Sequence, residues 1–109
     1  MKNVLHAFVS GIGVCLLAMT GSANGTQQEH PGAAAFREYC LVCHPGGSNI
    51  FDPEKSLHRK NMEANNIKTP EDIIRTIRNP GPRMTRFDEN TIPDRVAKDI
   101  AEYILENFR

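Results

Sequence analysis

The sequence contains no tryptophan, and only 6% of its residues are aromatic. It has no excess of charge of either sign, because 13 basic and 13 acidic residues cancel. This balance argues against a nucleic-acid-binding domain, which carries clustered Lys and Arg. A chain of 109 residues is long enough for one domain. Because a domain of this size buries only a marginal core, we expect a buried cofactor to supplement it.

Long apolar runs are absent except near the N-terminus. Lys2 precedes a mostly apolar stretch at 4–19, and a cluster of small residues follows at 20–23. That order is typical of a secretory signal peptide, and Ala23 fits the last small position of a cleavage site. The run is shorter than the roughly 20 residues that a membrane span needs. We therefore expect residues 1–23 to be removed, leaving a mature chain without a transmembrane segment.

Cysteine is scarce, and its positions are informative. Cys15 lies in the expected signal peptide and would leave with it, unless it is lipidated and anchors the protein to a membrane. A flexible leader at 24–31 then precedes one domain at 32–109. We expect a periplasmic protein, with an outer-membrane or lipid-anchored form as the alternative. In that oxidising compartment Cys40 and Cys43 form a disulfide, a metal site or a haem attachment.

The remaining pattern predicts an all-α domain. Asp52 and Thr69 each stand before a proline at a first helical position, which is a typical N-cap arrangement. Thr91 begins the last helix with a pattern that resembles a capping box. The expected helices lie at 32–43, from 53 to about 62, at 70–78, and from 91–94 to 108. No alternating strand pattern and no internal repeat is present.

Residues 40–44 read Cys-Leu-Val-Cys-His, the C-x-x-C-H spacing of covalent haem attachment. Two side chains three residues apart near a helix end share one face, about 5–6 Å apart at Cβ. This spacing suits thioether bonds from Cys40 and Cys43 to two vinyl groups of one porphyrin. We predict one haem c, with His44 as an iron ligand whose other ring nitrogen donates to a carbonyl near Pro53.

Other uses of the two cysteines fit less well. A structural zinc site needs about four protein ligands, and His30 and His58 would have to complete it at irregular spacing. A thioredoxin-like redox pair would need a βαβ pattern, which is absent. A simple disulfide would leave His44 without a role.

The second axial ligand has four candidates. We expect Met62 and His58 at the surface, because both lie in a polar helical stretch, and His30 solvated in the leader. Met84 follows the rigid Pro-Gly-Pro turn at 80–82, and such a loop can lay a thioether over the open haem face. The alternative role for Met84 is to fill a gap in the core.

Together these features resemble the class I cytochromes c, most of all the cytochrome c6 type, over nearly all of 32–108. The residues that carry the likeness are Gly32, Phe36, Cys40, the stretch 46–57, Asn79 five residues before Met84, and 99–104. The resemblance implies about four helices wrapped around one covalent haem, with Met84 as the axial methionine. The family usually has proline just after that methionine, where this chain has Thr85.

The resemblance also implies a function, which is one-electron transfer between a redox-protein donor and acceptor by a monomer or weak oligomer, not enzymatic catalysis. A haem-based ligand-binding or sensor module, or a weak peroxidase, is the alternative and needs a labile sixth position. A third possibility is an assembly module of a larger redox enzyme. Either the arginines around Met84 (Arg78, Arg83 and Arg86) form a positive docking rim, or Arg83 and Arg86 pair with Asp88 and Glu89.

Overall fold

The computed structural model describes residues 25–109 and three isolated glycines before them, Gly11, Gly13 and Gly21. The rest of the predicted signal peptide, including its cysteine, lies outside these residues. The described part is helical and contains no strand, which confirms the all-α prediction. Its elements are α1 (Pro31–Tyr39), η1 (Pro45–Gly47), η2 (Pro53–Lys55), α2 (Arg59–Ala64), α3 (Pro70–Arg78) and α4 (Asp94–Asn107), where η denotes a 3-10 helix.

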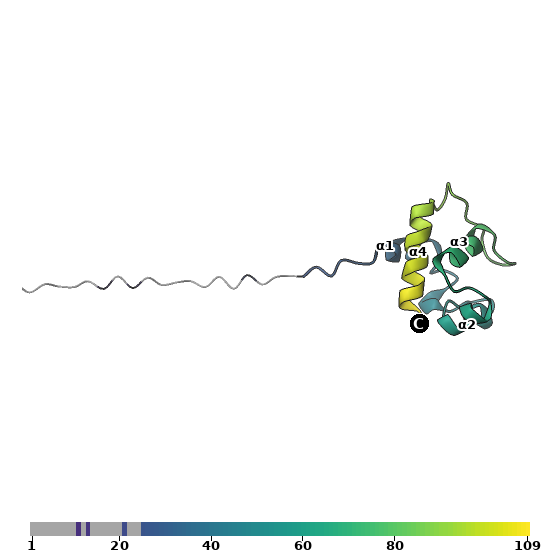
Figure 1. Ribbon diagram of the computed structural model, residues 1–109, viewed down its shortest axis with the longest axis horizontal. Helices are drawn as coiled ribbons and strands as arrows, with labels where there is room; N and C mark the ends of the chain where they lie inside the picture. The colour runs from purple at the N-terminus through teal and green to yellow at the C-terminus, as the bar shows by residue number, and fades with distance from the viewer. Residues whose placement is uncertain (1–10, 12, 14–20, 22–24) are drawn as a thin grey trace, which may run out of the picture.

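The first and last helices cross in direct backbone contact (Figure 1). Gly32 permits this contact, because a Cβ at that position would lie 2.0 Å from the carbonyl oxygen of Asp99. Two alanines of α4, Ala97 and Ala101, are fully buried in the same core. α3 packs on α4 as well and contributes the buried Ile73 and Ile77, so α4 contacts both other long helices.

Helix α1 is shorter than predicted, because it ends at Tyr39 and not at 43. Its last turn closes on one acceptor, since the carbonyl of Phe36 takes the N–H groups of both Cys40 (2.9 Å) and Leu41 (3.0 Å). The C-x-x-C-H motif therefore lies in the turns that follow the helix, with the N–H of His44 bonded to the carbonyl of Cys40 at 2.9 Å.

The helix predicted from 53 to about 62 is divided in two. Asp52 caps η2 as expected, since its side chain accepts the N–H of Glu54 at 3.0 Å. Ser56 is extended, and the N–H of Leu57 bonds to Gly47 at 2.7 Å instead of to its own helix. This tertiary hydrogen bond separates η2 from α2.

Of the caps predicted for the last two long helices, one is confirmed and the other is wrong. Thr69 and Asp72 form the full capping box that begins α3. The box predicted at Thr91 is wrong, because Pro93 is the N-cap of α4 and no side chain caps that helix. The carboxylate of Asp88 accepts the N–H of Thr91 at 2.9 Å, which draws this residue into the preceding turn.

Candidate functional site

A cavity of about 710 Å³ opens between the turns after α1, the segment 49–57 and the loop between α3 and α4. Its volume lies within the range of about 300–1,000 Å³ that is typical of cofactor sites. Four predicted site residues line it: Cys40, Cys43, His44 and Met84.

Cys40 and Cys43 lie in one short turn and are not joined by a disulfide. Burial raises the pKa of the Cys40 thiol to about 11, and the neighbouring Cys43 adds to the effect. No group of three or more His, Cys, Asp or Glu that could hold a metal ion occurs within the described part of the chain.

His44 is nearly buried, with 9% of its surface exposed. Its Nδ1 lies 2.8 Å from the carbonyl oxygen of Ser48. A carbonyl only accepts, so Nδ1 carries the proton and Nε2 keeps a free lone pair. Burial lowers the pKa of His44, with the bond to Ser48 opposing, so the ring stays neutral. The carbonyl that orients the ring therefore belongs to Ser48 and not, as predicted, to a residue near Pro53.

The two methionine candidates line the same cavity, which corrects one prediction. Met62 was expected at the surface, yet only 3% of it is exposed, and it belongs to the core cluster. The sequence around it is polar, but this side chain of α2 packs into the core cluster with Ile73 and Ile77. Met84 is half-buried in the loop, and its neighbours Pro82 and Thr85 line the cavity as well.

The two histidine candidates lie away from the cavity lining. His58 is exposed, as predicted, and its ring meets the edge of Phe108. His30 is not simply solvated, because its Nδ1 accepts the N–H of Gly32 at 3.0 Å and caps α1. Its Nε2 lies 3.4 Å from a carboxylate oxygen of Glu106, which ties the end of the leader to α4.

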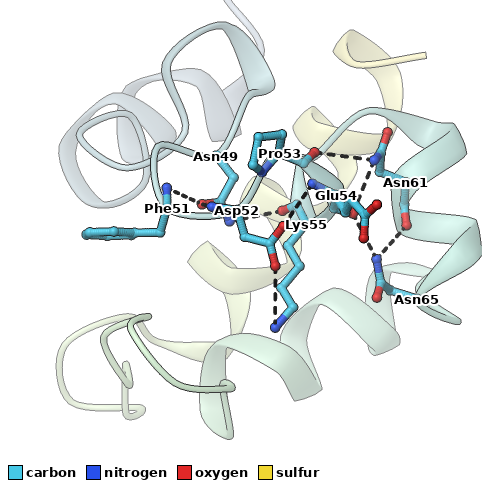
Figure 2. A network of polar contacts seen from close by, with 8 residues as sticks. All are labelled: Asn49, Phe51, Asp52, Pro53, Glu54, Lys55, Asn61 and Asn65. Carbon is cyan, nitrogen blue, oxygen red and sulfur yellow. Dashed lines mark hydrogen bonds and ion pairs between the residues drawn. The ribbon is translucent and has the colours of Figure 1, made fainter.

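Three asparagines hold the cavity-lining segment around η2 in place (Figure 2). Asn49 accepts the N–H groups of Phe51 and Asp52 and donates to the carbonyl of Lys55 at 3.1 Å. Asn61 and Asn65 on and after α2 each donate to the carbonyl of Glu54 at 3.1 Å. These bonds fix the backbone that carries the charged side chains Asp52 and Lys55, which are 3.9 Å apart.

The three arginines around the Met84 loop make different contacts. Arg78 is largely buried and pairs with Asp94 at 2.8 Å and with Glu89 at 3.5 Å. Arg86 donates from Nε to the carbonyl of Arg78 at 2.9 Å. Within residues 25–109, Arg83 has no ion pair, lines the cavity and has a positive φ of 71°. No ion pair joins Arg83 or Arg86 to Asp88 or Glu89 within the same range, although the charge of Arg86 contributes to lowering the pKa of Asp88.

Sequence reasoning missed two aromatic residues of the cavity wall. Tyr39 and Phe87 both line it, and their rings meet edge to face with centroids 5.9 Å apart. Their positions in the sequence, next to Cys40 and near Met84, are the features that indicate a place in the cavity wall. Phe87 is held there by its N–H, which donates to the carbonyl of Ile77 at 2.9 Å.

The chain is similar in sequence to known proteins. Residues 27–104 match the family described as cytochrome c oxidase, cbb3-type, subunit III. A cytochrome c6 of Cyanidium caldarium is 31% identical over 104 residues, which is 95% of this chain and 92% of the relative. A cytochrome c6 of Nostoc is 28% identical over 96% of this chain and 93% of its own length.

Solved structures are similar as well. OmcF, an outer membrane cytochrome F from Geobacter sulfurreducens, is 45% identical with a TM-score of 0.70, over 72% of this chain and 99% of that one. Oxidised cytochrome c6A from Arabidopsis thaliana is 30% identical with a TM-score of 0.62, over 70% of this chain and 85% of that one. The predicted helical fold around a single cofactor site therefore has solved counterparts.

Proposed function

Because the chain belongs to the class I cytochromes c, as a cytochrome c6-like monohaem electron carrier with one covalent c-type haem, we propose that Cys40 and Cys43 bind this haem and that His44 and Met84 ligate its iron. One observation supports this assignment above all. Four side chains of the required types line a single cavity of about 710 Å³. Two cysteines not joined by a disulfide and a neutral imidazole have the chemistry that the group requires.

Each residue has a distinct task in this proposal. The two cysteines hold the group through thioether bonds, and the haem supplies a one-electron couple at its iron. His44 offers Nε2 to the metal, while Ser48 holds Nδ1–H and so fixes the ring. The Met84 thioether favours the reduced iron and raises the potential. Lys55, a cation of the cavity lining, suits a carboxylate of the propionates.

Partner docking is proposed beside the same cavity. Val42 and Phe51 line it and yet are 77% and 51% exposed. A hydrogen bond of 3.1 Å from the N–H of Ile50 to the carbonyl of Cys43 brings the two exposed segments together. An apolar surface next to the redox centre suits a short-lived contact with a redox-protein donor or acceptor.

The cofactor assignment is tested on the exported holoprotein. A haem stain on a denaturing gel and a redox-difference spectrum report covalent attachment and iron coordination. The single variants Cys40→Ala and Cys43→Ala should reduce holoprotein yield severely, and the double variant should retain no haem on the gel. A double variant that keeps its haem stain would refute attachment at this motif.

Export to the periplasm, with cleavage after Ala23, is the second part of the proposal. It rests on the signal-peptide pattern at 1–23. No helix among residues 25–109 is long and apolar enough to cross a membrane. The name of the related OmcF places that protein in an outer membrane, so lipidation at Cys15 is the alternative. The intact mass of the native protein separates the two, because a mass that includes Cys15 and acyl chains would contradict cleavage after Ala23.

A further inference from the structure

The C-terminal end of the chain lies against the loop that follows His44. The ring of Phe108 covers Gly47 so closely that a Cβ at Gly47 would be 2.5 Å from Cδ1 and 2.8 Å from Cγ of that ring. Gly47 also has a φ of 80°, which disfavours any side chain there. The position therefore combines a left-handed backbone with an aromatic ring in direct contact.

Backbone hydrogen bonds hold both partners of this contact. The carbonyl of Gly47 accepts the N–H of Leu57 at 2.7 Å. The carbonyl of Phe108 accepts the N–H of Arg59 at 2.8 Å. The two donors, Leu57 and Arg59, are only two residues apart in the chain. The same short segment is therefore bonded to both the residue after α4 and the turn η1.

Aromatic neighbours fix the Phe108 ring itself. Its centroid is 5.4 Å from that of Phe36, and 6.1 Å from those of Tyr103 and His58. Edge and tilted contacts of this kind stabilise a ring beyond the area they bury. The ring is therefore held from α1 and α4 while it presses on the loop.

The loop in turn sets the orientation of His44. The N–H of Gly47 donates to the carbonyl of His44 at 3.1 Å. The next residue, Ser48, provides the carbonyl that accepts the Nδ1–H of His44 at 2.8 Å. A displacement of Gly47 would therefore move the acceptor that orients the imidazole.

We propose that Phe108 is a positioning residue for His44, acting through Gly47 and the carbonyl of Ser48. The inference rests on the proposed role of His44 as iron ligand. A strong hydrogen bond from Nδ1–H raises the basicity of a metal-bound imidazole. A more basic ligand stabilises oxidised iron more than reduced iron, so the Phe108 contact lowers the potential.

The test compares variants of the full-length holoprotein. Phe108→Ala removes the ring and should raise the midpoint potential, and the Nδ1 proton of His44 should exchange faster with solvent by NMR. Phe108→Tyr keeps the ring and should keep both values. Phe108→Leu retains part of the bulk, should shift both values less, and decides the question if the alanine variant does not accumulate.

A matched control separates positioning from general packing. Val96→Ala trims a half-buried residue of α4 that lies about 18 Å along the helix from Phe108, at 1.5 Å per residue. It should lower the unfolding midpoint without moving the potential or the proton exchange.

The role of Phe108 and the ligation by His44 would be refuted by different results. If Phe108→Ala loses stability but keeps the wild-type potential and exchange rate, Phe108 only packs, and the inference is wrong. If His44 is not an iron ligand, the wild-type holoprotein itself will lack a hyperfine-shifted His44 Nδ1 proton. That second result would refute the proposed ligation, whatever Phe108 does.

Discussion

Two methionines line one cavity, and at the scale of single residues their surroundings distinguish them. Met62 belongs to the buried core cluster beside Ile73 and Ile77, whereas Met84 is half-buried in an irregular loop. A core methionine fills space, and a leucine can replace it at a cost below about 1.5 kcal/mol. A ligand methionine is needed for its sulfur.

We therefore expect opposite results from the same substitution at the two positions. Met84→Leu should abolish the weak far-red sulfur-to-iron band of the oxidised protein, lower the potential and let the reduced iron bind carbon monoxide. Met62→Leu should leave all three properties as in the wild type. Absorption spectra and redox titration provide the measurement, and loss of the band in Met62→Leu alone would identify Met62 as the ligand.

At the scale of elements, the crossing of α1 and α4 depends on Gly32. Gly→Ala in a helix interior normally stabilises by roughly 0.5–1 kcal/mol. Here the new Cβ would meet backbone atoms of Asp99 and Ile100, the nearest at 2.0 Å, so the helices would have to separate. Gly32→Ala should therefore destabilise the fold by about 1–3 kcal/mol or more in denaturant unfolding.

A control on the same helix tests the reason for that sign. Ala34 is exposed, and Ala34→Gly should cost only the roughly 0.5–1 kcal/mol that helix propensity predicts. A stabilising Gly32→Ala would show that the two helices are not in backbone contact.

The start of α3 makes stability depend on pH. Asp72 accepts the N–H groups of Lys68 (3.0 Å) and Thr69 (3.1 Å) and pairs with Arg75, and these bonds hold its pKa at about 2. A carboxyl whose pKa is lower in the folded than in the unfolded state stabilises fully above its unfolded pKa. That stabilisation is lost as the pH falls from about 4 towards 2.

Asp72→Asn should accordingly destabilise the protein at pH 5 and flatten the loss of stability between about pH 4 and 2. Denaturant unfolding at a series of pH values measures both effects. Glu71→Gln removes an acidic residue from the same helical turn and should keep the wild-type slope. An unchanged slope in Asp72→Asn would mean that other carboxylates control acid unfolding.

At the scale of the whole molecule, the predicted positive rim is reduced to Arg83. Arg78 is committed to Asp94 and Glu89, and Arg86 bonds to backbone, whereas Arg83 lies at the cavity without an ion pair within residues 25–109. A cation beside the redox centre of a nearly neutral protein can steer an acidic partner.

Arg83→Glu should then slow electron transfer to an acidic acceptor at low salt, as measured by stopped flow. Wild type should lose this advantage as salt rises, because the Debye length is only about 8 Å at physiological ionic strength. Arg95→Glu makes the same charge change at an exposed position outside the cavity lining and should have a smaller effect. Equal rates for wild type and Arg83→Glu at low salt would contradict steering by Arg83.

Local sequence patterns are enough to predict the helical class, the caps at Asp52 and Thr69, and the end of α3 before Pro80. These features are local, because a capping side chain or a proline ring acts on backbone within a few residues. The C-x-x-C-H motif is also local, so its chemistry could be predicted without knowing what surrounds it.

Packing between the helices controls which side chains share the cavity. Met62 is buried although its sequence neighbours are polar, and the N–H of Leu57 bonds to Gly47, ten residues away in the chain, which divides the predicted helix. Arg78 does not contribute to the predicted positive rim, because it is paired with Asp94, sixteen residues away in the chain. Such contacts depend on how the helices pack, and no local pattern encodes them.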